Sequence, residues 1–553
     1  MTIKKWWQSG TPWVWMNAAA VAASIIMVVG ILGLIGVRGL GHFWPSSVQQ
    51  IEYRQADNSL VTYAGIPQEQ ETIAGSLVTD SRFSGVDSEQ VIGRELFKLG
   101  NRDVTGVDFK WFWSDLIESR SYPEDIYVLE RFEWGGFIGY VHALNMGDQT
   151  ITDVEAIHTM LPQLLEESES LRAQVKSIEV HDIGSVNYSM EKIRLQRKRY
   201  EIDEIDDPSL YEKLEQEKLD LDKQYVEHFE ALGLLRQQLS KNSLVMKTAS
   251  GDETTIPLSM IVQMYRPNRM NALEKFSLYL HNFKEFIFGA PREANTEGGV
   301  FPAIFGTVTM VIIMSIFVTP FGVIAAVYLR EYAKQGKLTG TIRIAVNNLA
   351  GVPSIVYGVF GLGFFVYFLG GNIDALFYPE SSPAPVFGTP GLLWASITLA
   401  LLTVPVVIVA TEEGLARIPK SVREGSLALG ATKFETLYKV VIPMASPAMM
   451  TGLILAVARA AGEVAPLMLV GVVKLAPTLP IDGNFPFIHL ERQFMHLGFH
   501  IYDVGFQSPN IDAARPLVYA TAFLLVAVIA SLNLTAIYIR NRLRERYRSL
   551  ETY

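Results

Sequence analysis

The chain has 553 residues, of which 49% are apolar, and it carries 47 basic against 57 acidic side chains. It contains no cysteine, so disulfide bonds, thiolate metal ligands and cysteine nucleophiles are excluded. This apolar content fits either a large soluble protein or a membrane protein, and the length of the uncharged apolar runs decides between them.

Six apolar runs in the sequence are long enough to cross a membrane, because spanning the hydrocarbon takes about 20 apolar residues. We therefore predict a mainly α-helical, polytopic membrane protein with six transmembrane helices. The first run is longer than the ~7–15-residue hydrophobic region of a cleaved signal peptide, which favours a retained signal anchor. The predicted spans lie at residues 14–37, 300–329, 344–369, 391–411, 445–473 and 516–539.

Basic residues predict the orientation of these spans, because lysine and arginine collect in cytoplasmic loops. Lys4 and Lys5 precede the first span, five arginines lie in residues 540–553, and residues 370–391 contain no basic side chain. We therefore expect a cytoplasmic N-terminus (residues 1–13), a cytoplasmic tail and an external loop. The arginine-rich tail is interpreted as a topology signal and not as a nucleic-acid site.

The region at residues 38–297 separates the first two spans, and we expect it to form a periplasmic insertion domain. Residues 38–298 hold 27 basic and 43 acidic side chains, whereas the rest of the chain holds 20 and 14. The net negative charge therefore belongs to the insertion, whose overall field would repel an anion. Its surface is suited to solubility or to protein contact.

The insertion is expected to have an α+β fold with a long helical hairpin. Alternating apolar and polar residues around a Gly-Gly pair predict a β-hairpin at residues 125–144, and a second is expected at 243–257. Residues 154–241 have aliphatic side chains at helical spacing, and an Asp-Asp-Pro sequence at 206–208 divides them into two helices. The helical hairpin is either a docking arm for a binding protein or partner subunit, or a solvated spacer, which charge-rich helices more often are.

The loop at residues 412–444 is expected to contain two short helices joined by a sharp turn. Each helix start has the reciprocal capping-box pattern, a hydroxyl residue followed three positions later by glutamate. A glycine between them can adopt the left-handed conformation that ends the first helix, and a proline is expected to stop the second. We call residues 420–443 the knob; its signals are Ser421 and Glu424, Thr432 and Glu435, Gly430, and Pro443.

Two charged residues, Arg459 and Glu463, interrupt the fifth predicted span. They are four positions apart, so on a helix they share a face and can pair. Each such group costs roughly 2.5–3.5 kcal/mol at the centre of a span, so it normally faces a cavity, a partner or a pathway. We predict that Arg459 contacts a transported anion and that Glu463 orients it. The alternatives are an ion pair that locks two helices, or a span end from which Arg459 reaches the interface.

The third predicted span contains Gly351, Val352 and Pro353 in sequence. This combination frees a backbone carbonyl and permits a kink. The small and polar residues around it more often serve helix packing than ligand binding, so we assign none of them as a ligand.

Motifs for catalysis are absent from the sequence, which has no GxxxxGK[ST] phosphate loop, no HExxH, no GxSxG elbow and no kinase signature set. We therefore expect no catalytic residue, no cofactor and no metal ligand in this chain. The energy for any transport has to come from another polypeptide, which we expect to dock on the knob.

Three segments together resemble the phosphate-transport ABC permeases, and most of all the PstA family. They are NNLAGVPSIVYGVFGLG (347–363), EGSLALGATKFETLYKVVIP (424–443) and ARAAGEVAPLMLVG (458–471). The middle segment is similar to the EAA loop of ABC importers: Glu424, Gly430 and Pro443 keep its spacing, whereas other small residues replace both alanines. The resemblance covers about residues 296–545.

This resemblance implies a multi-pass permease subunit of an importer for inorganic phosphate in the bacterial inner membrane. It implies a heterodimer with a paralogous PstC-like permease, a dimer of PstB-like cytosolic ATPases on the EAA loop, and a PstS-like periplasmic phosphate-binding protein. It also implies that Arg459 and Glu463 match the intramembrane charged positions of the phosphate path.

Two other functions remain open from the sequence. An importer of another oxyanion, such as sulfate or molybdate, would use an arginine in the membrane equally well. A membrane-anchored sensor or scaffold would instead detect a signal with the acidic insertion and contact a signalling protein through the knob. The six apolar runs and the intramembrane charges argue against the sensor, which needs only one anchor.

Overall fold

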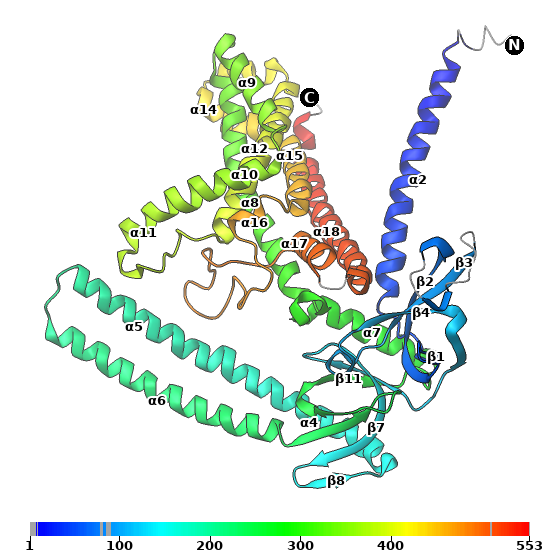
Figure 1. Cartoon of the computed structure of the whole chain (residues 1–553). Helices are drawn as coiled ribbons and strands as arrows, with labels where there is room; N and C mark the ends of the chain where they lie inside the picture. The colour runs from blue at the N-terminus through cyan, green and yellow to red at the C-terminus, as the bar shows by residue number, and fades with distance from the viewer. Residues whose placement is uncertain (1–6, 8, 78–80, 84–89, 509–510, 552–553) are drawn as a thin grey trace. The chain divides into compact units, whose positions relative to one another are not determined.

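The computed structural model describes residues 7, 9–77, 81–83, 90–508 and 511–551 (Figure 1). Lys4 and Lys5, on which the predicted orientation partly rests, lie outside the described residues. The described part of the chain divides into two compact units. Unit 1 comprises the residues up to His42, Val300–Tyr378 and the residues from Pro383 onward, and unit 2 comprises Phe43–Gly299 with the short segment Pro379–Ser382.

Unit 1 contains six helices that are long and apolar enough to cross a membrane, counted over the described residues. Their number is the predicted one. They are α2 (Thr11–Gly41); α8 (Phe301–Val327) with the π-helical turn η7 (Tyr328–Tyr332); α10 (Ser354–Phe360) with the π-helix η8 (Gly361–Gly370) and α11 (Gly371–Phe377); α12 (Leu392–Arg417); α14 (Lys433–Thr436) with the π-helical turn η10 (Leu437–Val441) and α15 (Ile442–Gly462); and α18 (Ile511–Glu551). Shorter elements of this unit are α9 (Lys337–Leu349), α13 (Lys420–Ala428), α16 (Leu467–Val470), α17 (Leu497–Tyr502) and the π-helical turn η11 (Asp503–Gln507).

The third predicted span, residues 344–369, is wrong at its start. The separate helix α9 ends at Leu349, and α10 begins only at Ser354. Pro353 precedes α10 directly, and because proline both lacks an N–H and disfavours helix in the residue before it, the chain breaks here. The predicted kink is therefore a full interruption, at which the Tyr357 hydroxyl donates to the Leu349 carbonyl over 2.6 Å.

The fifth predicted span, residues 445–473, is wrong at both ends. The helix runs from Lys433 through η10 into α15 and stops at Gly462. Pro443 does not stop it, because the preceding π-helical turn adjusts the backbone and Pro443 falls in the first turn of α15, where a missing N–H costs little. Pro466 keeps the residues after Gly462 from continuing the helix, and α16 is a short separate turn.

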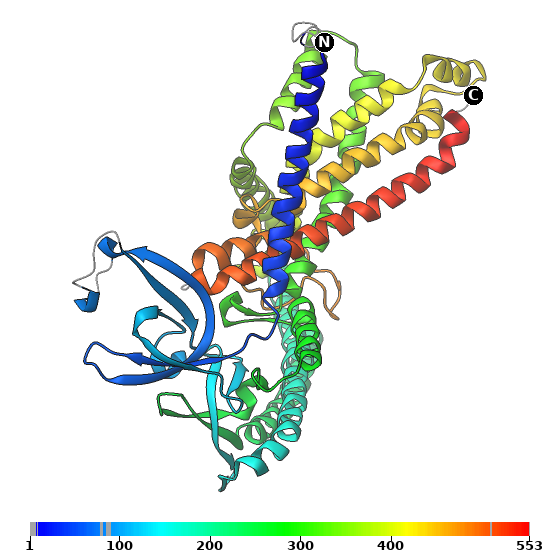
Figure 2. The ribbon, with the colours of Figure 1, turned by 90° about the vertical axis from the view of Figure 1, so that its right-hand side faces the viewer.

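The core of unit 1 forms where α8, α12 and α15 pack together. Small residues allow the close approach: a Cβ on Gly452 would lie 2.7 Å from the Cβ of Ala410, and one on Gly414 would lie 2.4 Å from the Cβ of Ala448. Such contacts bring two membrane helices close enough for van der Waals packing along their length. In Figure 2 the yellow α12, the gold α15 and the red α18 run side by side.

Unit 2 contains two larger antiparallel sheets in the part of the chain that the structure describes. The first has the order β4-β3-β2-β1-β5 and the second the order β10-β9-β7-β6-β11, with β8 paired to β7. Both predicted hairpins are confirmed, since β6 pairs with β7 and β9 with β10. The strands are β1 (Gln49–Arg54), β2 (Leu60–Ala74), β3 (Val91–Lys98), β4 (Phe109–Trp113), β5 (Ile117–Ser121), β6 (Tyr127–Arg131), β7 (Phe137–Met146), β8 (Gln149–Ile151), β9 (Asn242–Lys247), β10 (Glu253–Pro257) and β11 (Ile261–Tyr265).

The predicted helical hairpin is also present in unit 2, where α5 and α6 lie side by side (Figure 1). Asp207 caps α6 by accepting a hydrogen bond from the Ser209 N–H, and Pro208 occupies the first turn, where its missing N–H costs nothing. The Asp-Asp-Pro sequence therefore starts the second helix as expected. The helices of this unit are α3 (Arg102–Thr105), α4 (Val154–Ser177) with the π-helical turn η4 (Ile178–Ile183), α5 (Gly184–Ile202), α6 (Pro208–Leu239) and α7 (Ala272–Phe288).

Arg131, only 3% exposed, orders the turn between β6 and β7. Its guanidinium pairs with both carboxylate oxygens of Asp103 at 2.8 and 3.0 Å and donates to the Gly135 carbonyl at 2.9 Å. Arg131→Gln is expected to lower the free energy of unfolding of this region by about 3 kcal/mol, because it leaves a mostly buried carboxylate uncompensated. Hydrogen exchange of the β6 and β7 amides in the full chain checks this. Arg194→Gln, in an exposed pair with Glu191, serves as the control; equal exchange in the two variants would contradict the prediction.

Candidate functional site

The knob is two short helices joined by a tight turn. The first, α13, is followed by Gly430 at φ +88°, and α14 begins at Lys433. The Gly430 N–H donates to the Leu427 carbonyl at 3.0 Å, and the Ala431 N–H donates to the Ser426 carbonyl at 3.2 Å. These bonds satisfy carbonyls at the end of α13, and a left-handed residue makes them possible. The turn assigned to Gly430 is therefore confirmed.

One of the two predicted capping boxes is present. Thr432 accepts from the Glu435 N–H, and the Glu435 carboxylate accepts from the Thr432 N–H. The other prediction is wrong: α13 begins at Lys420 after Pro419, so Ser421 lies inside the helix and makes no cap. A proline with extended backbone just before a helix sets its start without a side-chain bond, and here it takes the place of the box. Glu424 lies on the exposed surface of α13.

The outer surface of the knob carries large apolar side chains. Leu429 is 91% exposed, and Phe434 and Tyr438 are 68% and 65% exposed. The two rings stack with centroids 6.1 Å apart and planes 2° from parallel, as residues four apart on a helix can. Large exposed apolar side chains are typical of surfaces that contact another protein. Sequence reasoning missed this pair, although the spacing of the two aromatics was a signal for it.

The inner surface of the knob packs against the ends of the spans. Leu437 and Val441 join Leu415 of α12, Ile418 directly after that helix, and Ala445 of α15 in one buried apolar cluster. The knob is therefore attached to α12 and α15 on one side and open on the other.

Arg459 and Glu463 form the predicted ion pair, with Arg459 Nε 3.5 Å from Glu463 Oε1. Arg459 lies in the last turn of α15, and Glu463 is its C-terminal cap with extended backbone. The side chains are 34% and 20% exposed. The pair is thus held across the end of a helix and is not fixed on one continuous helical face.

The helix contacts give the depth of this pair along α12. Gly452 lies against Ala410 and Gly414 against Ala448, so the two helices are antiparallel and in a fixed register. Arg459 is seven residues beyond Gly452, or about 10 Å at 1.5 Å per residue. This places Arg459 roughly level with Thr403, near the middle of α12. A charged pair and an irregular backbone therefore occur together at mid-span, where irregular backbone is tolerated only if it is buried in protein or lines a water-filled cavity.

The pair lies at the edge of the packed core of unit 1. Leu455 and Gly462, on one side of Arg459 along α15, are exposed, whereas Ala456 and Ala460 on its other side are buried in the core. The Arg459 side chain itself is 34% exposed. Arg459 therefore borders an open face of the unit and is not enclosed in its interior.

The interrupted third span lies next to this pair. A Cβ on Gly358 of α10 would lie 2.7 Å from the Cα of Pro466, three residues beyond Glu463. Helix α10 and the chain that follows α15 are thus neighbours.

The segment after α16 is held by its own polar contacts. Burial would raise the pKa of Asp482, but hydrogen bonds from the Asn484 N–H, Arg492 and His489 outweigh it and lower this pKa to about 2. Nearby, burial lowers the pKa of His496 to about 4, so its imidazole is neutral at pH 7. Its Nδ1 accepts from the Gly498 N–H. This segment is therefore ordered, and the His496 ring adds no positive charge.

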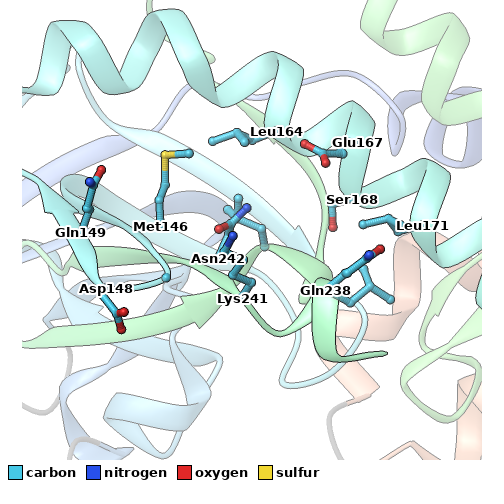
Figure 3. Close-up of a pocket in the computed structure, with 13 residues that line it drawn as sticks. Met146, Asp148, Gln149, Leu164, Glu167, Ser168, Leu171, Gln238, Lys241 and Asn242 are labelled. Atoms are coloured by element: carbon cyan, nitrogen blue, oxygen red, sulfur yellow. The ribbon is translucent and has the colours of Figure 1, made fainter. Parts of the chain in front are cut away.

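Unit 2 contains a separate pocket of about 740 Å³ between α4, the end of α6 and the β7–β8 turn (Figure 3). Glu167, Lys241 and Asp148 contribute side chains of both signs to its lining. None of its lining residues holds a buried side-chain polar atom without a hydrogen-bond partner. Across the described residues, no group of three His, Asp or Glu side chains is placed to hold a metal ion. The pocket therefore offers no convergent chemistry, and the pair at Arg459 is the stronger candidate.

Sequence comparisons relate the chain to transport permeases. Residues 318–549 match the family described as "Binding-protein-dependent transport system inner membrane component". The "Probable ABC transporter permease protein YqgH" of Bacillus subtilis is 34% identical over 35% of this chain, which spans 59% of that protein. The "Phosphate transport system permease protein PstA 1" of Mycobacterium tuberculosis is 33% identical over 44% of this chain and 71% of that protein. The "Probable phosphate transport system permease protein PstC" of Methanocaldococcus jannaschii is 32% identical over 52% of this chain and 89% of that protein.

The solved structures include a chain of the MetNI methionine ABC transporter in inward-facing conformations. It is 20% identical and covers 44% of this chain and 94% of its own length, with a TM-score of 0.31. This score is too low to carry an argument, so the relation to permeases rests on sequence.

Two glycines of the knob provide a matched test of its geometry. Gly430→Ala forces a side chain into the left-handed region and is expected to destabilise the turn by about 1 kcal/mol. Gly425→Ala lies inside α13 with open space around the added Cβ and is expected to stabilise that helix by up to about 1 kcal/mol. Hydrogen exchange of the knob amides should therefore become faster in the first variant and slower in the second. Changes in the same direction would contradict the observed turn.

Proposed function

The chain belongs to the family of inner membrane components of binding-protein-dependent transport systems, and we propose that it is the permease subunit of an ATP-driven importer for inorganic phosphate. The observation that carries the proposal is the Arg459–Glu463 pair, located at mid-span at the edge of an open face of unit 1. The relatives named as phosphate transport permeases support the choice of substrate.

Arg459 is the residue we propose to contact the anion. Its guanidinium offers several N–H donors in a plane, which suits the oxygens of phosphate. Glu463 at 3.5 Å competes for these donors and keeps the anion from being held too tightly, as conduction through a pathway requires. No covalent chemistry is assigned to these residues, and the chain acts as a gate.

The open face around Arg459 is completed, in this proposal, by a second permease of the PstC-like kind. A part-exposed charged pair at mid-span is costly against lipid, where each charge costs roughly 2.5–3.5 kcal/mol. A partner permease would remove this cost by closing a polar pathway between the two subunits. The similarity of this chain to a protein named PstC is consistent with two paralogous subunits that share one fold.

The knob is the site that we propose for the PstB-like ATPase dimer. Its open side presents Leu429, Phe434 and Tyr438, with Glu424 exposed on the same short helical structure. Closure of the ATPase dimer would move the knob, and the knob would move α15, which carries Arg459 at its other end. ATP binding and hydrolysis belong to the ATPase, so the chain itself is not an enzyme.

The proposed topology follows from this assignment. The knob and both termini lie in the cytoplasm, and residues 38–297 form a periplasmic insertion domain at the bacterial inner membrane. A PstS-like binding protein would deliver phosphate from the periplasm. The insertion hairpin α5–α6 is either its docking arm or a solvated spacer.

Uptake of radiolabelled phosphate by cells that express this chain with its partners tests the proposal. Arg459→Gln is expected to lower uptake by about tenfold to a hundredfold, the usual effect of losing a hydrogen bond to a charged group. Glu424→Lys is expected to lower it by weakening ATPase docking. Arg194→Gln, in an exposed pair on α5, should transport as wild type does.

The outcome also separates the alternatives. Uptake of sulfate or molybdate without phosphate would keep the permease and overturn the substrate. Normal phosphate uptake by Arg459→Gln at a matched membrane level would overturn the pathway. If no anion moves, and a signal that depends on the insertion survives in Arg459→Gln, the sensor function is correct instead.

A further inference from the structure

The π-helical turn η7 at the end of α8 joins both helices of the knob at one residue, Glu331. The Glu331 carboxylate accepts a hydrogen bond from Arg423 Nη2 of α13 at 2.8 Å. The backbone carbonyl of the same residue accepts from Lys433 Nζ of α14 at 2.6 Å, and the Lys433 ammonium lies 4.5 Å from the centre of the Tyr332 ring. Glu331 is thus where the knob meets α8 through polar contacts.

Arg423 is held on its other side by α12. Its Nη1 donates to the Ile418 carbonyl at 2.7 Å, and its Nη2 also donates to the Leu415 carbonyl at 2.8 Å. These carbonyls end α12, so a cation there is favoured by the helix dipole. The Arg423 and Glu331 side chains are only 20% and 12% exposed. The guanidinium therefore fixes three elements, α12, α13 and η7, in one arrangement.

A second set of contacts joins η7 to α9. Arg343 Nη2 donates to the Leu329 carbonyl at 3.2 Å, and Arg343 Nε pairs with Glu412 of α12 at 3.1 Å. The turn that receives the knob therefore also holds the helix that leads to the break before α10. π-Helical turns are often found at functional sites, because they place carbonyls and side chains outside the regular ladder.

We propose that Glu331 is the positioning residue through which displacement of the knob is passed to α8. The inference rests on the proposed function, since it presumes that an ATPase moves the knob. Apolar contacts between the knob and the spans resist separation, but they are non-directional and permit sliding. A part-buried carboxylate–guanidinium contact fixes direction as well as distance. Without it, the knob would still dock the ATPase, but its movement would no longer set the position of α8.

The experiment uses the whole complex in proteoliposomes: this chain, its partner permease, the ATPase and the phosphate-loaded binding protein. Glu331→Gln is expected to leave the amount of bound ATPase unchanged and to lower the stimulation of ATP hydrolysis by the binding protein about tenfold, within the range of coupling between distant sites. Arg423→Gln should lower stimulation at least as much, because it also removes the contacts to the Ile418 and Leu415 carbonyls. The double variant should be no worse than Arg423→Gln alone, because the Arg423–Glu331 contact is already lost there.

Glu412→Gln is the matched control, because it breaks an ion pair between α12 and Arg343 of α9 and leaves in place both the Arg343 contact to the Leu329 carbonyl and the Arg423–Glu331 contact. It is expected to keep stimulation close to wild type. Unchanged stimulation in Glu331→Gln would overturn the inference. So would an equal loss of bound ATPase and of stimulation, because Glu331 would then only shape the knob.

Phosphate uptake by the wild-type complex distinguishes a failure of the inference about Glu331 from a failure of the proposed function. If hydrolysis is stimulated but no phosphate enters, the substrate is wrong, and the comparison between Glu331→Gln and Glu412→Gln still decides the role of Glu331. If wild type binds no ATPase, the knob is not a coupling site, and both proposals are overturned.

Discussion

The close packing of α15 against α12 is the constraint on which the rest of unit 1 depends. At Gly452 and Gly414 a side chain would collide with the facing helix, so the register of the two helices is fixed at two points. In lipid there is no hydrophobic drive between helices, and contact of this kind supplies the attraction. Because α15 carries the knob at one end and Arg459 at the other, this single register sets the position of both.

Fixed register also explains why a broken backbone is tolerated at mid-span. Between α9 and α10 and between α15 and α16 the regular helical ladder is interrupted, and turn bonds such as Val352 N–H to the Leu349 carbonyl and Leu467 N–H to the Val464 carbonyl replace only part of it. Protein contacts supply part of the hydrogen bonding and packing that lipid cannot provide. The Tyr357 hydroxyl donates a hydrogen bond to the Leu349 carbonyl, and α10 packs against Pro466. The two interruptions thus support one another, and each would be unstable against lipid alone. The charged pair lies beside one of these interruptions, at the end of α15.

The sequence predicted the features that depend on neighbouring residues. Gly430 and the Thr432–Glu435 box are local signals, and both are present; the Arg459–Glu463 pair follows from a spacing of four. The hairpins of unit 2 and the start of α6 at Pro208 were predictable for the same reason. The prediction of a first capping box at Ser421 and Glu424 was wrong because Pro419 already starts α13. The capping-box pattern takes no account of a proline just before it.

What the sequence did not predict depends on residues far apart in the chain. Arg423 and Glu331 are separated by 92 positions, and no periodicity links a cation in a loop to a carboxylate at the end of a span. The end of α15 at Gly462 was missed because the apolar composition continues past it. A long apolar run indicates that a segment is buried in lipid or protein, but it does not show that the whole segment is helical. The two kinds of information are complementary, because local signals build the knob and the ion pair, whereas tertiary contacts such as Arg423–Glu331 hold the knob against the end of α8.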